Sequence, residues 1–140
     1  MRHPFSTLLI AVFVLVPAVP GLAHHSVPAV FIESQQITLK GTITKIDWIN
    51  PHIHMFLNAT DQDGKLTTWE IETLPTSWMR KAGITKDALW SNAAAGEIVT
   101  VYANPARDAS RHLGYLMRIT YPDGHFFHVA GDPAAIAPTN

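Results

Sequence analysis

Short stretches of alternating apolar and polar residues constrain this chain more than any other feature of its sequence. Their two-residue period is that of a β-strand with one buried face. In the first stretch the alternation slips by one residue between Ile43 and Ile46. This slip predicts a β-bulge or a sharp bend, which Gly41 would permit. Six stretches follow one another and predict a mainly β fold: residues 36–48, 52–59, 65–73, 97–103, 112–121 and 125–130.

The segments between these stretches contain turn and helix signals. Asn50-Pro51 ends the first strand, because proline has no amide hydrogen to give to a sheet. Residues 61–64 (DQDG) are typical of a hairpin turn. Residues 75–82 predict a short helix between strands three and four, and residues 86–90 predict one more helical turn.

This order of elements predicts a small OB-like antiparallel barrel of five to six strands, with one short helix between strands three and four. A long bent first strand and a helix after the third strand are typical of such barrels. An open antiparallel sandwich with a covering helix is the alternative architecture.

The first 23 residues have the pattern of a secretory signal peptide. A basic residue, Arg2, precedes an apolar run at residues 8–20, and small residues follow at 21 and 23. The run is short for the roughly 20 residues that cross a bilayer, and two prolines interrupt it. We therefore expect cleavage before His24, a periplasmic or secreted protein, and no stable membrane insertion afterwards. An uncleaved N-terminal anchor is the alternative.

The composition after cleavage indicates one compact domain. Cleavage would leave 117 residues, with nine basic and eleven acidic side chains, a size usual for a single domain. The balanced charge predicts no nucleic-acid binding. The absence of cysteine excludes disulfides, thiolate-bound metals and cysteine nucleophiles. We expect a lead-in at residues 24–35, a barrel at 36–130 and a flexible tail at 131–140.

Histidine is the abundant residue with metal-binding chemistry. Cleavage would make His24 and His25 the first two residues, and a terminal histidine offers both its amine and its ring to a metal. His52 and His54 lie two positions apart on the second strand, so their side chains point the same way, about 7 Å apart. Amine and imidazole ligands favour Cu(II), with Zn(II) next. We therefore predict a non-catalytic metal site at these four histidines, with residues 27–35 folding the N-terminus back beside the second strand.

Other interpretations remain open. In one of them, the terminal histidines simply follow the cleavage site and Asn50-Pro51-His52 is a structural turn. Alternatively, Trp48 and Phe56 would form the contact face of an OB-like module for a ligand or a periplasmic protein, without a metal. An enzyme is not favoured, because the chain has no recognised substrate-binding motif, and no catalytic residue is predicted. Three remaining histidines and one carboxylate pair are interpreted as structural or solvated side chains: His112, His125, His128, Glu70 and Glu72.

Several runs of the sequence resemble DUF6152, a family of exported bacterial proteins of unknown function. The resemblance covers nearly all of residues 24–125 and implies a small periplasmic or secreted β-rich domain, without an established activity. The runs that carry it are the His-His-Ser start at 24–26, GTITKIDWINPHIH at 41–54, DGKLTTWEIET at 63–73, LPTSWMRKAGITKDAL at 74–89, GEIVTVYANPARD at 96–108 and ITYPDG at 119–124.

Overall fold

The computed structural model describes residues 26–60, 64–129 and 138–139, and in them strands predominate. None of the helices in these ranges is long and apolar enough to cross a membrane. The strands are β1 (Ile37–Asp47), β2 (His54–Thr60), β3 (Leu66–Glu72), β4 (Ile98–Pro105), β5 (Leu113–Thr120), β6 (Phe126–His128) and β7 (Pro138–Thr139). The helices are α1 (Val27–Val30), α2 (Thr76–Lys81), α3 (Lys86–Trp90) and the single 3₁₀ turn η1 (Ala93–Ala95).

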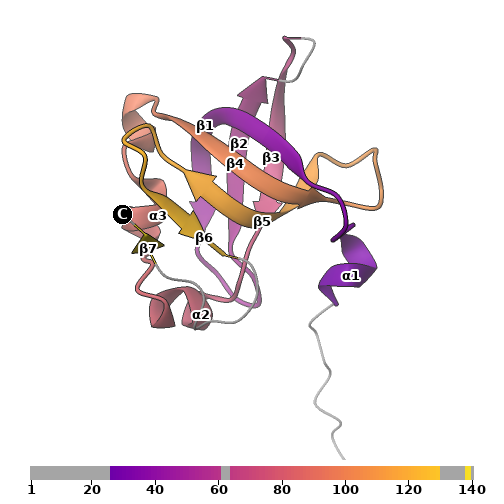
Figure 1. Ribbon diagram of the computed structural model, residues 1–140, viewed down its shortest axis with the longest axis horizontal. Coiled ribbons are helices and arrows are strands. Elements are labelled where there is room, and N and C mark those ends of the chain that lie inside the picture. Colours follow the sequence, from indigo (N-terminus) through magenta and orange to yellow (C-terminus); the bar gives the residue numbers. More distant parts are fainter. Residues whose placement is uncertain (1–25, 61–63, 130–137, 140) are drawn as a thin grey trace, which may run out of the picture.

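Five strands close into a barrel, which confirms the predicted fold class and excludes the open sandwich (Figure 1). The sheet runs β3-β2-β1-β4-β5, and β3 pairs again with β5 to complete the ring. The prediction of a wholly antiparallel barrel is wrong at this seam, because β3 and β5 pair in parallel. A closed ring with an odd number of strands cannot alternate direction at every pairing, so one parallel seam is unavoidable. Beyond the ring, β6 extends the sheet from β5.

The long first strand belongs to both halves of the barrel. One half of β1 pairs with β4 and the other half with β2, and the two ladders overlap at Gly41 and Thr42. The register against β2 shifts between Ile43 and Lys45. The predicted bulge is thus confirmed, and it lets one strand bend across the barrel.

The segment between β3 and β4 contains more helix than the one short helix of the predicted fold class. The predicted helix at 75–82 is α2, which gives way to Gly83 at a φ of 77°. The expected extra turn is α3, and the Thr85 hydroxyl accepts a hydrogen bond from the Ala88 amide at 3.1 Å. The turn η1 follows directly, in a stretch of small residues expected to be a loop.

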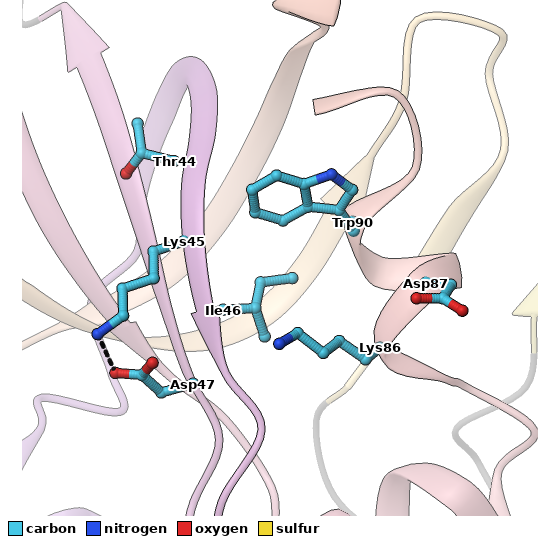
Figure 2. Close-up of a pocket in the computed structure, with 7 residues that line it drawn as sticks. All are labelled: Thr44, Lys45, Ile46, Asp47, Lys86, Asp87 and Trp90. Carbon is cyan, nitrogen blue, oxygen red and sulfur yellow. Dashed lines mark hydrogen bonds and ion pairs between the residues drawn. The ribbon is translucent and has the colours of Figure 1, made fainter. Parts of the chain in front are cut away.

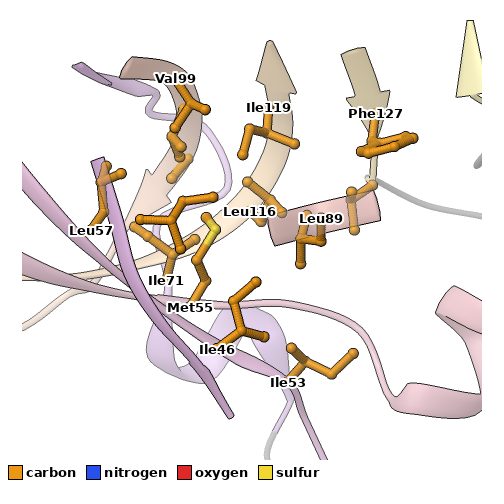
Figure 3. Close-up of a cluster of buried hydrophobic side chains, with 14 of the residues drawn as sticks. Ile46, Ile53, Met55, Leu57, Ile71, Leu89, Val99, Leu116, Ile119 and Phe127 are labelled. Carbon is orange, nitrogen blue, oxygen red and sulfur yellow. The ribbon is translucent and has the colours of Figure 1, made fainter. Parts of the chain in front are cut away.

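The interior of the barrel is filled by aliphatic side chains from every strand of the ring (Figure 3). Met55 and Leu57 on β2 and Ile71 on β3 are fully buried. Leu89 on α3 and Ile53, just before β2, are also fully buried. Residues 53, 55 and 57 therefore form one apolar face toward the core, and the alternate residues of β2 point outward.

The lead-in docks on the barrel, but not where we expected it. Phe31 forms a bridge with Ala106 and is fully buried. The amide of Ile32 donates to Pro105 at 2.9 Å, and the amide of Arg107 donates to Val30 at 2.8 Å. The lead-in thus lies at the end of β4 rather than beside β2. The physical reason is that this end offers both backbone partners and a buried place for the Phe31 ring.

Candidate functional site

Two histidines and two glutamates face one another across the start of β2 and the end of β3. His54 is the first residue of β2, and its partner in the antiparallel register is Glu72. Glu70 lies opposite Phe56, two positions along on the same side of the sheet. His52 precedes β2 and is only 8% exposed. We call His52, His54, Glu70 and Glu72 the His–Glu cluster.

In both rings of the His–Glu cluster, Nδ1 is the nitrogen that faces a protein oxygen atom. His52 Nδ1 lies 2.9 Å from the carbonyl oxygen of Thr73 and 3.4 Å from Glu72 Oε1. His54 Nδ1 lies 2.8 Å from Glu70 Oε1, within ion-pair distance but without hydrogen-bond geometry. A carbonyl oxygen can only accept a hydrogen bond, so Nδ1 of His52 carries a proton.

The Asn50-Pro51-His52 run fixes the position of His52. Asn50 Oδ1 accepts hydrogen bonds from the amide and the hydroxyl of Thr76, at 3.3 and 2.9 Å, at the start of α2. The next residue, Ile53, donates to Leu74 at 3.3 Å and accepts from Thr73 at 2.9 Å. The run is therefore a structural turn, as one interpretation held, and the same turn brings His52 to Thr73 and Glu72.

Substituting Asn50 with alanine should destabilise this turn. The change removes both bonds to Thr76, and lost capping or part-buried hydrogen bonds cost about 1–2 kcal/mol. Urea denaturation measures this loss. Asn58→Ala is a matched control, because Asn58 Oδ1 makes a single exposed bond with Thr68. An equal loss in both variants would contradict the role assigned to Asn50.

A row of polar side chains connects the His–Glu cluster to the docked lead-in. In the strand registers His54 lies opposite Glu72, Glu72 beside Tyr115, and Tyr115 opposite Asn104. Asn104 Nδ2 donates to the carbonyl of Gln35 at 2.6 Å and to that of Glu33 at 3.3 Å. The row therefore runs from the cluster to the underside of the lead-in.

Tyr115 is the member of this row that the lead-in covers most directly. Its ring lies 5.4 Å from the ring of Phe31, and it is 8% exposed. Burial, together with the negative charges of Glu72 and Glu33, raises the pKa of Tyr115 to about 12. The phenol therefore stays neutral beside the buried Glu72.

A hollow of about 350 Å³ adjoins the cluster. Glu70 belongs to both, since its carboxylate meets His54 and also lines the hollow. Phe56 lines the hollow, and Lys45 Nζ lies 5.1 Å from the centre of its ring. Trp48, the other predicted contact residue, instead packs partly against the core beyond the end of β1. The remaining lining residues are Thr68, Arg111, His112 and Leu113.

The histidines interpreted as structural have local partners where the structure describes contacts. The ring of His125 stacks on the ring of Tyr121, with the ring centres 4.2 Å apart, and His125 Nδ1 lies 2.5 Å from Asp123 Oδ1. Hydrogen bonds from His125 hold the pKa of the Asp123 carboxyl below its usual value. The rings of His112 and Trp69 make an edge-to-face contact, with their centres 5.3 Å apart.

Only two of the four histidines of the predicted metal site lie among the residues that the structure describes. His24 and His25 lie outside the described residues, whereas His52 and His54 both belong to the His–Glu cluster. Within residues 26–60, 64–129 and 138–139, no three histidine or acidic side chains are gathered closely enough to hold a metal ion. A shared site would therefore need ligands from beyond these ranges or a rearrangement within the cluster.

The glutamates of the cluster are the part that sequence reasoning misjudged. They were interpreted as a solvated pair, but Glu72 is only 4% exposed. The observed register, in which Thr60 pairs with Leu66, sets His54 against Glu72. Counting outward from the predicted turn at 61–64 would instead pair His54 with Ile71, so an error of one residue in the length of the turn hides this contact.

Comparison with known proteins gives one match. A family model described as "Family of unknown function (DUF6152)" matches residues 11–115, about three quarters of the chain. No curated protein and no solved structure matches it significantly.

Proposed function

This chain belongs to the DUF6152 family, and we propose that it is an exported, non-catalytic metal-binding domain. The metal is Cu(II) in preference to Zn(II), since amine and imidazole nitrogens follow that order of affinity. The ligands are His52 and His54 from the barrel, and His24 and His25 from the segment before α1. The export step rests on the signal-peptide pattern of the first 23 residues.

The way in which the two strand rings are held is the observation that carries this proposal. Metal-binding histidines commonly give their second ring nitrogen to a carboxylate or a carbonyl, which fixes the tautomer and the ring orientation. His52 has this arrangement with Thr73, and His54 Nδ1 faces Glu70 at 2.8 Å, within ion-pair distance but without a hydrogen bond. In both rings Nδ1 is the nitrogen that faces a protein oxygen, so we assign Nε2 to the metal.

The docked lead-in supports the contribution of the terminal histidines. Phe31 packs on Tyr115 of β5, and β5 is separated from β2 by β3 alone. Two strand spacings amount to about 10 Å. A helical turn of four residues rises about 6 Å, and each further residue can add up to about 3.5 Å. The terminal histidines are therefore within reach of the cluster.

Titration with Cu(II) tests the proposal on a chain that begins with a free His24 amine. We expect one tight site, with nitrogen ligands visible by electron paramagnetic resonance. Acetylating the amine, or combining His52→Ala with His54→Ala, should weaken binding by about 100-fold or more. Glu70→Gln should weaken it about 10- to 100-fold, as loss of an outer-shell partner does.

Histidines outside the proposed site provide the control for this titration. His128→Ala changes an exposed histidine at the other side of the sheet, so it should leave Cu(II) affinity unchanged. Circular dichroism establishes that each variant is folded. If neither the blocked amine nor the double substitution changes the affinity, the proposal is wrong.

A binding module without metal is the second candidate, and the hollow beside Glu70 favours it. The hollow combines an aromatic wall, Phe56, with charged and hydroxyl groups, the mixture usual in ligand sites. This function predicts binding that a chelator leaves unchanged and that Phe56→Ala weakens. The Cu(II) titration separates the two candidates, because only the first requires the histidine nitrogens.

A further inference from the structure

A second hollow, of about 450 Å³, lies between the bulged part of β1 and helix α3, apart from the His–Glu cluster (Figure 2). Ile46, which is buried, forms an apolar surface facing α3. Trp90 and Lys86 extend from α3 toward it. Thr44 adds a hydroxyl group, and Lys45, Asp47 and Asp87 complete the lining.

The charged side chains around this hollow differ in whether they are paired and in where they point. Lys45 bends away and pairs with Asp47 at 2.7 Å, so these two charges offset each other. Asp87 also lines the hollow, and in Figure 2 its carboxylate is turned away from Ile46. Within the part of the chain that the structure describes, Lys86 has no carboxylate partner, and its side chain is directed toward Ile46. The ammonium group of Lys86 therefore lies beside the apolar surface of Ile46.

Trp90 gives the hollow a flat aromatic wall. Its side chain is half-buried and packs partly against the core, so the indole is held in place rather than loose in solvent. Aromatic rings prefer stacked or edge-on contact with other rings, and a held ring loses little entropy on contact. A planar apolar group fits between this wall and Ile46.

We propose that the hollow between β1 and α3 binds a small planar organic anion, with its ring against Trp90 and its carboxylate on Lys86 Nζ. The two recognition elements come from the same helical turn, four residues apart, which sets them on one side of α3. This site is independent of the proposed metal site. The open shape of the hollow implies weak binding of a small probe, with a dissociation constant in the millimolar range.

Benzoate is a suitable probe, followed by nuclear magnetic resonance of the ¹⁵N-labelled full chain. We expect saturable shifts of the Trp90 indole and Ile46 signals. Lys86→Gln should weaken benzoate binding about tenfold, and Lys81→Gln, an exposed lysine on α2, should not weaken it. Two related compounds should each bind at least about fivefold more weakly. Benzyl alcohol keeps the ring but not the charge, and cyclohexanecarboxylate keeps the charge but not the flat ring.

Loss of benzoate binding can be distinguished from loss of folding even if a tryptophan variant is unstable. Lys86→Gln changes an exposed side chain, so it should not affect folding, and Trp90→Phe keeps an aromatic wall where Trp90→Leu removes it. Equal binding of benzoate by the wild type and Lys86→Gln would overturn the proposal. So would equal affinity for benzyl alcohol, or shifts that spread over the surface without saturating.

Discussion

Gly41→Ala is expected to cost about 3–5 kcal/mol of folding free energy, the range of the most severe single substitutions. A Cβ atom at this position would lie 2.0 Å from the carbonyl oxygen of Asn58 and 2.8 Å from the Cα of Ala59. Both atoms belong to the backbone of β2, so no side chain can rotate away to relieve the clash. Gly41 also pairs with Val99 on its other side, which holds β1 in place.

Chemical denaturation measures the loss, and Gly64→Ala is the control. Gly64 has a φ of 77° in the hairpin turn, but a Cβ atom there would meet nothing within 4 Å. Its replacement should cost only about 1 kcal/mol, the cost of the backbone conformation alone. A loss at Gly41 no larger than that at Gly64 would show that β1 and β2 can separate locally, contrary to the close approach described.

The strand pattern predicted the barrel because alternation identifies both the element and its inner face. Residues 53, 55 and 57 are the alternating apolar positions of the strand predicted at 52–59, and all three are fully buried. The bulge in β1 was also readable, since a slip of one residue in a period of two has few other causes. The parallel seam between β3 and β5 was not readable from any one strand, because it follows from closing the ring.

The candidate site was only partly predictable, because its second half comes from another strand. His52 and His54 were visible as a pair, whereas their carboxylate partners depend on the exact register of the hairpin. The lead-in was misplaced for a similar reason. Its docking on β4 depends on free backbone partners at Pro105 and Arg107, which exist only once the barrel is formed.

Phe31→Ala should separate the contribution of the lead-in to stability from its contribution to the site. Phe31 is fully buried and packs on Tyr115. Removing a buried phenylalanine ring costs about 3–5 kcal/mol. With the ring gone, Tyr115 should become more hydrated, and its pKa should fall from about 12 toward its ordinary value. An ultraviolet pH titration, compared with a Tyr115→Phe chain, measures this change.

Phe127→Ala is the matched control, because Phe127 is 6% exposed and belongs to β6, away from the lead-in. Both variants should lose similar stability in urea. Only Phe31→Ala should lower the pKa of Tyr115. Only Phe31→Ala should also weaken Cu(II) binding by a chain with a free His24 amine. The reason is that the lead-in would no longer hold the terminal histidines near His52 and His54. If Cu(II) affinity falls equally in both variants, the effect reflects general loss of stability. If it falls in neither while the pKa of Tyr115 still drops, the lead-in is docked as described but does not deliver ligands to the cluster.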